Sequence, residues 1–255
     1  LLYTHDHEAS FLVEYVDETA DEFQTAVRLH HEKRVTGCIF LGGRIDERAH
    51  VLTGIDMPMV FATISAENAN LPRAGSVFID NRMMGRLAMQ TLIDAGHTKI
   101  AIFGGARQSD DGFGQRYQGA MEALEKAGIP FDGERYVDTR FSLRGAYDTA
   151  RGFFAMKPDT TAVFAMSDTV AMGVIRALSD IGRRVPQDVS VVGYDGIEMG
   201  KYFLPRLTTV EQPINDIARE SVAMLMGMLE KGEEPRHVVV PASLITRESV
   251  GPANK

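Results

Sequence analysis

Residues 161–173 read TAVFAMSDTVAMG and decide the fold class of the chain. The apolar run Ala162 to Met166 is followed at once by the polar pair Ser167-Asp168 and then by residues with helical spacing. A strand of a parallel sheet is covered by helices on both faces, so its apolar residues follow one another, whereas a half-exposed antiparallel strand alternates apolar and polar residues. The stretch therefore predicts a buried parallel strand that leads directly into a helix.

Short strands and longer helices alternate in the same way along the rest of the chain. The expected strands are residues 35–41, 59–63, 77–80, 99–104, 161–166, 190–194 and 237–240, and the expected helices lie near 16–34, 82–95, 113–127, 142–156, 168–181 and 213–231. Several of these helices end at a glycine, as at Gly96, Gly128 and Gly182, a common way to terminate a helix. The alternation predicts an α/β fold built on parallel sheet.

The last expected helix is apolar around more of its surface than one core-facing stripe requires. Its apolar face carries Ile214, Ile217, Ala218, Ser221, Leu225, Met228 and Leu229, with Val222, Met224 and Met226 beside them. Two interpretations stay open: the helix is buried between its own sheet and neighbouring elements, or it contributes to a subunit interface.

The amino-acid composition limits the classes of protein to which the chain can belong. The 255 residues, 44% hydrophobic and 24% charged, are typical of a globular protein with room for two lobes. The longest apolar runs are far shorter than the roughly 20 residues of a membrane-spanning helix.

The formal net charge of −8 and the pI near 5.4 argue against direct binding of nucleic acid phosphates, so any DNA contact must come from another segment. The single cysteine, Cys38, predicts a small core residue and no disulfide.

Motifs of common enzymes are missing from the strand-to-helix turns. The chain has neither a Walker phosphate loop nor a dinucleotide fingerprint there, and it has no nucleophile elbow. His5 and His7 near the chain start, and the adjacent His30 and His31, are interpreted as solvated side chains. The sequence therefore predicts no catalytic residues, no metal site and no cofactor.

Polar residues at strand exits are the first candidates for a binding site, because ligands of open α/β sheets bind at the carboxyl ends of the strands. These candidates are Asp80, Asn81, Ser167, Asp168, Asp195 and Gln212, together with Arg116 near the start of a helix. Asp168 and Asp80 have an alternative interpretation as helix N-caps, since a carboxylate can accept bonds from free backbone N–H groups.

Two longer stretches carry a specific resemblance. They read GRRVPQDVSVVGYD at 182–195 and LPRLTTVEQP at 204–213, and they are supported by VFIDN at 77–81, GHTKIA at 96–101, RYQG at 116–119, AMSDTVAMG at 165–173 and LITRES at 244–249. Together they resemble the lactose/galactose repressor (LacI/GalR) family of bacterial transcription regulators. The resemblance extends from about residue 35 to residue 250.

This resemblance implies a fold similar to that of the periplasmic sugar-binding proteins, with two α/β lobes and a ligand cleft between them. The chain would visit each lobe twice, with residues 1–95 plus 212–237 in the N-terminal lobe and 96–211 plus 238–255 in the C-terminal lobe. Leu1 to Thr4 resemble the second strand of the first lobe, so we expect that the first strand, its helix and the DNA-binding headpiece are absent from this sequence.

The resemblance also implies roles for the candidate residues. Arg116 and Asp195 would hold the effector, since a guanidinium donates to sugar hydroxyls and a carboxylate accepts from them. Ser167 stands where many relatives have Asn, and Asp168 beside it contacts the effector or shapes the loop. Gln212 lies at a crossover between lobes, and Asp80 and Asn81 lie at the hinge or the cleft rim.

One position departs from the family. Relatives often stack an aromatic residue on the effector in the segment before Gly145, and the alignment places Arg140 or Phe141 there. If Arg140 faces the cleft, an anionic effector such as a sugar phosphate fits. The effector class stays open among sugars, sugar phosphates, nucleosides and nucleobases.

The function expected from the resemblance is the effector-sensing and dimerisation part of a cytoplasmic transcription repressor. It would act as a homodimer, with a tetramer as a further possibility, and would reach operator DNA only through the absent headpiece. The alternative is an extracytoplasmic sugar-binding protein of a transport system, which a signal peptide upstream of Leu1 would distinguish from a regulator with a helix-turn-helix. An enzyme ranks third, because no nucleophile, base and orienting group align in the sequence.

Overall fold

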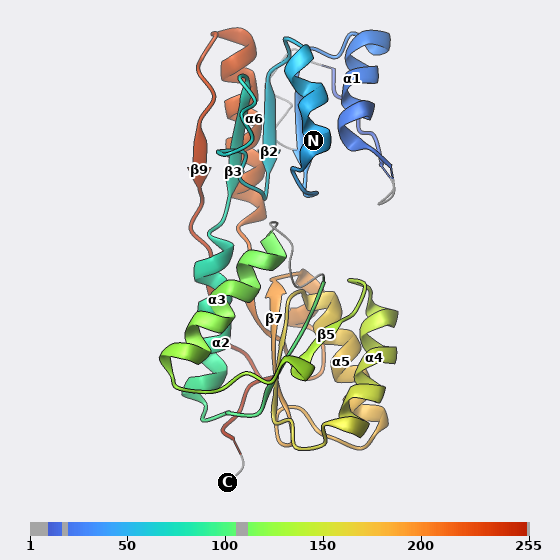
Figure 1. Ribbon diagram of the computed structural model, residues 1–255, viewed down its shortest axis with the longest axis vertical. Helices are drawn as coiled ribbons and strands as arrows, with labels where there is room; N and C mark the ends of the chain where they lie inside the picture. The colour runs from blue at the N-terminus through green and yellow to red at the C-terminus, as the bar shows by residue number, and fades with distance from the viewer. Residues whose placement is uncertain (1–9, 17–19, 106–111, 254–255) are drawn as a thin grey trace. The chain divides into compact units, whose positions relative to one another are not determined.

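A computed structural model describes residues 10–16, 20–105 and 112–253. The chain divides into two compact units (Figure 1). The first unit comprises Leu1–Ile79 and Pro213–Pro241, and the second comprises Asp80–Gln212 and Ala242–Lys255. The strand expected at Leu1 to Thr4, like His5 and His7, lies outside the described residues. Within the described residues no helix is both long and apolar enough to span a membrane.

The boundary between the units differs from the expected one. Residues 80–95 were expected in the first lobe, but the structure groups helix α2 (Asn81–Asp94) with the second unit. The physical reason is that α2 packs along α3 (Gly112–Lys126), which is also in the second unit. The return crossings also shift slightly, to Gln212/Pro213 and Pro241/Ala242.

In the described part of the first unit, four strands form a parallel sheet. Its elements are α1 (Glu22–Lys33), β1 (Cys38–Leu41), the 3-10 helix η1 (Glu47–Gly54), β2 (Met59–Ala62), β3 (Ala74–Phe78), α6 (Ile214–Glu230) and β9 (His237–Val239). The strand order is β1-β2-β3-β9, and all neighbours are parallel.

Helices cover both faces of this sheet. On one face, Phe23 of α1 contacts Phe40 and Phe61, which are register partners in β1 and β2. On the other face lies α6, whose Met224 packs against Gly75 of β3. Residues Met224 to Met228 of α6 are all buried, so the broad apolar surface predicted for this helix is largely covered within its own unit.

The described residues of the second unit form a sheet of six strands. Besides α2 and α3, its elements are β4 (Ile100–Gly104), the 3-10 helix η2 (Gly133–Arg135), β5 (Tyr136–Asp138), α4 (Leu143–Met156), β6 (Ala162–Ala165), α5 (Asp168–Asp180), β7 (Ser190–Asp195), the 3-10 helix η3 (Glu198–Lys201), β8 (Thr208–Glu211) and β10 (Ser243–Ile245). The strand order is β10-β8-β7-β6-β4-β5, parallel except for the β10–β8 pair.

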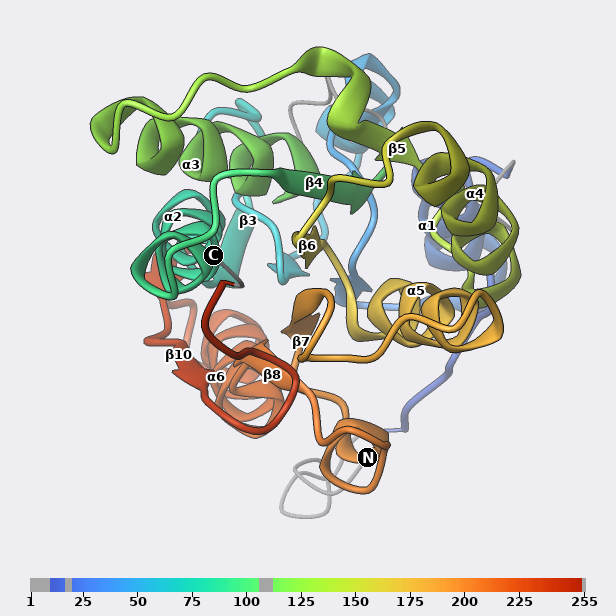
Figure 2. The same cartoon turned by 90° about the horizontal axis from the view of Figure 1, so that it is seen from below.

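Helices α2 and α3 cover one face of this sheet, and α4 and α5 cover the other (Figure 2). The α/β class with parallel-sheet lobes is thereby confirmed. Two strands were not predicted, β5 and β10, which are only three residues long. Strand β8 agrees with the placement of Gln212 at a strand exit. Helix α1 begins at Glu22 and not near residue 16, because Asp21 caps it by accepting bonds from two backbone amides.

A close crossing of α2 and α3 fixes the start of the second unit. A Cβ atom added to Gly119 of α3 would overlap the backbone carbonyl of Arg82, and one added to Gly85 of α2 would overlap that of Arg116. Because both obstacles are backbone atoms, neither can rotate away. The two helices approach this closely only because both positions are glycine.

We expect Gly119→Ala to destabilise the protein by roughly 1–3 kcal/mol, the usual cost of overpacking a filled interior. The matched control is Gly152→Ala in α4, where an added Cβ meets open space and should stabilise by roughly 0.5–1 kcal/mol. Urea unfolding of both variants measures the difference. Equal stabilities for the two variants would contradict the crossing as described.

The buried side chain of His97 connects the amino ends of three strands to Gly251. His97 is 2% exposed. Its Nδ1 lies 3.0 Å from the hydroxyl of Thr161, and its Nε2 lies 2.9 Å from that of Ser190 and 3.1 Å from the carbonyl of Gly251. Burial lowers the pKa of His97, and the bond to Gly251 opposes this shift.

The lowered pKa makes the stabilising contribution of His97 depend on pH. The unfolded chain takes up a proton near pH 6.5 and the folded chain only at lower pH, so the contribution is complete above about pH 6.5 and is lost as the pH falls below it. We expect the stability difference between the wild type and His97→Gln to shrink from pH 7.5 to pH 5.5. Urea unfolding at both pH values tests this, and a constant difference would contradict it.

Candidate functional site

The candidate site is centred on the buried guanidinium of Arg116, at the carboxyl edge of the second unit's sheet. The Arg116 side chain, on the first turns of α3, is 9% exposed. Its Nε donates to Asn81 Oδ1 at 2.9 Å, and its Nη1 donates to the carbonyl of Met166, just after β6, at 2.6 Å. Nη1 also lies 3.8 Å from Asp195 Oδ1 at the end of β7. Three elements far apart in the sequence therefore meet at one side chain.

Two aromatic rings complete the surroundings of Arg116. Its guanidinium carbon lies 3.7 Å from the ring centroid of Tyr194 and 4.9 Å from that of Phe113. The Tyr194 hydroxyl donates to the same Asn81 oxygen at 3.0 Å, and burial raises the pKa of Tyr194 to about 12. Contacts between a guanidinium and ring faces stabilise a desolvated cation.

The Asp195 carboxylate is the exposed partner in this cluster. Its side chain is 28% exposed, against 9% for Arg116, and its Oδ1 accepts from Gln212 Nε2 at 2.8 Å. The backbone of Asp195 has a φ of +114°, a conformation that costs free energy for a residue with a side chain. Burial raises the pKa of Asp195, while the charge of Arg116 and the bond from Gln212 oppose this shift.

Ser167 and Asp168 lie at the first turn of α5, beside Asp195. Ser167 is the N-cap, since its Oγ accepts from the amide of Val170 at 3.1 Å; the N-cap interpretation of Asp168 is therefore wrong. Asp168 is fully buried, which leaves no surface for contact with a ligand. Burial raises the pKa of Asp168 to about 6, and the charge of Asp195 adds to this shift.

Phe113 and Phe141 form an apolar wall at the same edge of the sheet. Their ring centroids are 4.0 Å apart, and the Phe141 ring lies over Gly105, just after β4. Both Arg140 and Phe141 have positive φ values, near +50°. The Arg140 side chain is exposed, and its amide donates to Asp138 at 2.9 Å. Of the two residues aligned with the family's aromatic position before Gly145, Phe141 is the one whose ring lies at this edge.

The remaining predicted residues lie where the chain passes between units. Asp80 is exposed and caps α2 by accepting from the amide of Met83 at 2.8 Å, as its alternative interpretation stated. Asn81 is 3% exposed and binds Arg116, and Gln212 is the last residue before the second crossing. The structure therefore brings Arg116, Asp195, Asn81 and Gln212 together and leaves Asp80 at the helix end.

Sequence reasoning missed Tyr194 and Phe113. Phe113 precedes Arg116 by three residues on α3, a spacing that places two side chains on the same helix face, so this contact could have been predicted. Tyr194 lies in β7 directly before Asp195. Successive strand residues point to opposite faces, and no sequence pattern indicates that a ring on one face reaches the same guanidinium.

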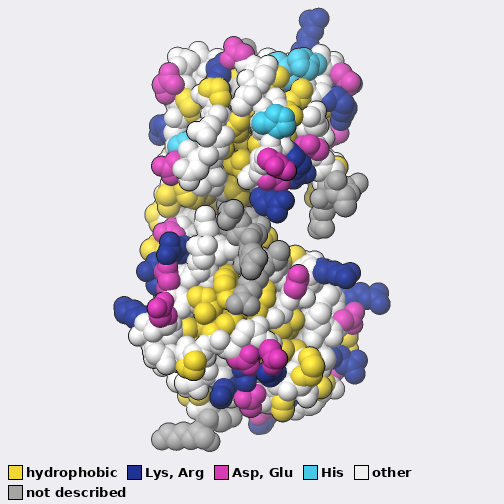
Figure 3. Space-filling model, in the orientation of Figure 1, with side chains coloured by type: hydrophobic (Ala, Val, Ile, Leu, Met, Phe, Trp, Pro, Cys, Tyr) yellow, Lys and Arg dark blue, Asp and Glu magenta, His cyan; other side chains and the backbone are white. Residues whose placement is uncertain are grey.

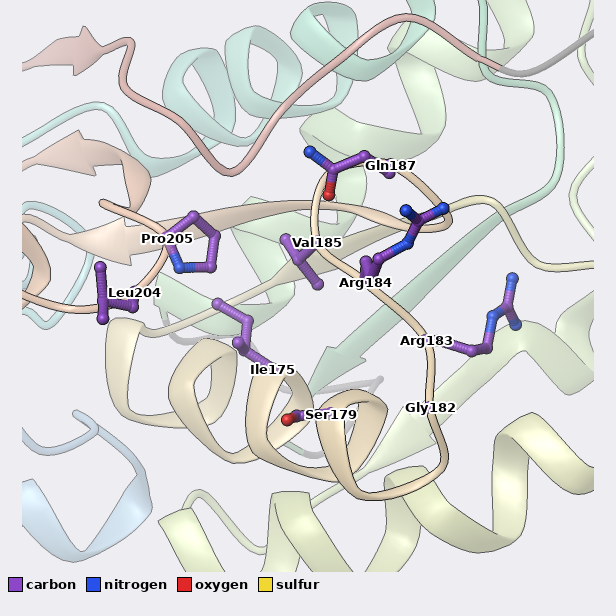
Figure 4. A pocket seen from close by; sticks show the side chains of 9 residues that line it. All are labelled: Ile175, Ser179, Gly182, Arg183, Arg184, Val185, Gln187, Leu204 and Pro205. Carbon is purple, nitrogen blue, oxygen red and sulfur yellow. The ribbon is translucent and has the colours of Figure 1, made fainter.

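Two hollows lie elsewhere on the second unit. One, of about 360 Å³, is shown in Figure 4; Ile175 and Ser179 of α5 face Val185 and Leu204 across it, and Arg183 points away. The other, of about 480 Å³, lies beside Lys99 and Ile129, near the carboxyl end of α3. Neither is lined by any predicted site residue.

The site is equipped for recognition. A carboxylate and a guanidinium 3.8 Å apart can accept from and donate to neighbouring hydroxyls of one ligand, and the phenylalanine pair can face an apolar side of a ring. Among the described residues, no cluster of three histidine, cysteine or acidic side chains could hold a metal ion.

Comparison with known proteins places these features in a family. Residues 89–250 match the family model of the periplasmic binding protein-like domain. The chain is 32% identical over 231 residues to the HTH-type transcriptional regulator MalR of Clostridium butyricum, covering 89% of this chain and 68% of MalR. It is 39% identical over 174 residues to the HTH-type transcriptional repressor PurR of Yersinia pestis, covering 68% of this chain and 51% of PurR.

A solved structure agrees with these relatives. The LacI family transcriptional regulator of Enterococcus faecium, with bound ribose, has a TM-score of 0.77 and 27% identity, with 87% of this chain and 82% of that chain covered. The chain spans about half the length of PurR and about two thirds of MalR. The relatives are transcriptional regulators, which supports neither the transport-receptor alternative nor an enzyme. On the family match and the identities above 30%, the chain belongs to the LacI family of transcriptional regulators.

Proposed function

We propose that the second unit binds a small-molecule effector, a sugar or a sugar derivative, at Arg116 and Asp195, and that this binding modulates operator DNA binding by the whole regulator. The observation that carries the proposal is the juxtaposition of a buried guanidinium with a partly exposed carboxylate at the carboxyl edge of a parallel sheet. Adjacent hydroxyls of a sugar match this pair of acceptor and donor. The ribose bound to the Enterococcus faecium regulator supports the same ligand class.

The effector acts by differential affinity. A ligand shifts an equilibrium between two states of a regulator only as far as it binds one state more tightly than the other. Arg116 and Asp195 each bond to a residue at a crossing between units, Asn81 and Gln212 respectively. A change of contacts at the site therefore reaches the chain segments that join the units.

We propose that operator contact is made by a helix-turn-helix headpiece outside these 255 residues. The chain carries a net charge of −8, and on the face shown in Figure 3 basic side chains are interspersed with acidic ones over both units. Binding of DNA phosphates depends on concentrated lysine and arginine, which this face lacks. A cytoplasmic location follows from such a role.

Ligand binding is tested by thermal shift against a panel of ribose, other mono- and disaccharides, sugar phosphates, nucleosides and nucleobases. At 100 times its dissociation constant, a ligand should stabilise the fold by about 2.7 kcal/mol. We expect one class to raise the melting temperature of the wild type, and we expect Arg116→Ala and Asp195→Ala each to abolish that rise.

The matched control removes an ion pair outside the site. Arg206 and Glu248 pair at 2.8 Å on the surface, and their alanine variants should keep the full ligand response. A response that persists in both Arg116→Ala and Asp195→Ala would overturn the placement of the site. A well-folded wild type that responds to no member of the panel would count against a sugar-class effector.

We also propose that the regulator is a homodimer and that the second unit contributes an apolar patch to the interface. This patch consists of Met199, Tyr202 and Leu204, which are 60%, 77% and 85% exposed and lie within six residues of one another at η3. Leu204 also lines the hollow of Figure 4. Large apolar side chains exposed together mark interaction surfaces, and a two-fold regulator that reads two half-sites needs a second copy.

The variants Tyr202→Glu and Leu204→Glu should shift the wild-type dimer toward monomer, because each places a charge in an apolar contact. Sedimentation velocity at tens of micromolar measures the effect. Leu87→Glu is the control, since Leu87 is 38% exposed on α2, which covers the face of the sheet opposite α5. A wild-type chain that sediments as a monomer, or variants that stay dimeric, would contradict this use of the patch.

A further inference from the structure

The Asp168 carboxylate connects the first turn of α5 to the turn after β7 and to β8. Asp168 Oδ1 accepts from the hydroxyl of Thr209 at 2.6 Å, and Oδ2 accepts from the amide of Ile197 at 2.8 Å. The nearby amide of Gly196 also lowers the pKa of Asp168, and the backbone amide of Asp168 lowers that of Asp195. We call the bonds from Thr209 and Ile197 to the Asp168 carboxylate the α5 clamp.

The α5 clamp is not explained by the needs of the helix. Ser167 already provides the N-cap of α5, so the helix does not require the Asp168 side chain for that purpose. A fully buried carboxylate is costly, and it persists only where its lone pairs are satisfied by donors. The donors here come from the turn that begins at Asp195 and from β8.

The turn needs such support. Asp195 has a φ of +114° and Gly196 one of +74°, so a residue with a side chain is held in a region that favours glycine. Strain of this kind persists only where the surroundings over-determine the backbone. The amide of Ile197, two residues after Asp195, donates to Asp168.

We propose that Asp168 is a positioning residue: through the α5 clamp it holds Asp195 in the conformation that presents its carboxylate to the effector. This inference rests on the proposed function of the site. Asp168 itself is 0% exposed, so its effect on a ligand must pass through Asp195.

The clamp couples ligand affinity to pH. The groups that act on Asp168 are the Asp195 charge, the Thr209 hydroxyl and the amides of Gly196 and Ile197; beyond Asp195 stands Arg116. With the pKa of Asp168 at about 6, protonation replaces an acceptor by an O–H donor as the pH falls below this value and weakens the clamp. His97 is a separate case, because it bonds to the amino end of β7.

Two substitutions of Asp168 distinguish the effect of its hydrogen bonds on ligand affinity from the effect of its charge. Asp168→Ala removes every acceptor, and we expect the affinity for the bound panel member to fall about tenfold or more, as for loss of hydrogen bonds to a charged group. Asp168→Asn keeps one oxygen for the amides and removes the titration. Its affinity should lie between those of wild type and Asp168→Ala and should stay flat from pH 7.5 to pH 5, where the wild type loses affinity.

Further variants guard against a general loss of structure. Thr209→Val removes one donor with little change of shape and should weaken binding in the same direction, by less than Asp168→Ala. Asp180→Asn, at the exposed carboxyl end of the same helix, should bind as the wild type does. Isothermal titration gives the affinities. Wild-type affinity in a folded Asp168→Ala variant, or a wild-type pH profile in Asp168→Asn, would overturn the inference.

A measurement without ligand keeps the inference separate from the proposed function. Carbon-13 NMR of the Asp195 carboxyl follows its titration in the wild type and in Asp168→Asn. As Asp168 gains its proton near pH 6, the Asp195 signal of the wild type should show a step there, which Asp168→Asn should remove. A wild-type Asp195 signal with no step near pH 6 would overturn the inference even if a ligand binds. If no panel ligand binds but the step is present and is lost in Asp168→Asn, the proposed function fails while the coupling of Asp168 to Asp195 stands.

Discussion

A permanent positive charge inside the second unit determines how its parts are arranged. Arginine keeps its proton at all relevant pH values, so the buried guanidinium of Arg116 must be met by acceptors and ring faces supplied by the protein. Asn81, the Met166 carbonyl, Tyr194 and Asp195 supply them. These partners come from α2, the end of β6 and the end of β7, so satisfying one charge fixes three segments against each other.

The same constraint shapes the surface of the site. Two of the donors of Arg116 are directed at Asn81 and the Met166 carbonyl, and the more exposed group of the pair is a carboxylate that also accepts from Gln212. Such an arrangement fits the recognition of hydroxyl groups in the proposed effector. It agrees with membership of a family of regulators.

Much of the fold was predictable because it depends on local pattern. The apolar run Ala162 to Met166 differs by one residue from the observed strand β6, which ends at Ala165. The unit boundary was not predictable in the same way, because it depends on which sheet α2 packs against. The glycines at 85 and 119 decide this, and their meeting is a long-range contact that no spacing in the sequence indicates.

For the site, the pairing of Arg116 with Asp195, 79 positions later in the sequence, came from family resemblance and not from spacing. Asp168 shows the limit of local rules: a carboxylate at a helix start predicts a cap, yet Ser167 serves as the cap and the Asp168 side chain turns toward a different loop. Which of two adjacent polar residues caps a helix depends on where the neighbouring strands place their donors.

The path of the chain between the units has a consequence for synthesis on the ribosome. Both units include late segments: the first needs α6 and β9, and the second needs β10 and the Gly251 carbonyl that bonds to His97. Domains tend to fold in order as the chain emerges, from the N-terminus onward. Here neither unit can complete its sheet until residues beyond 236 have been made, so the nascent protein carries two unfinished sheets at once up to that point.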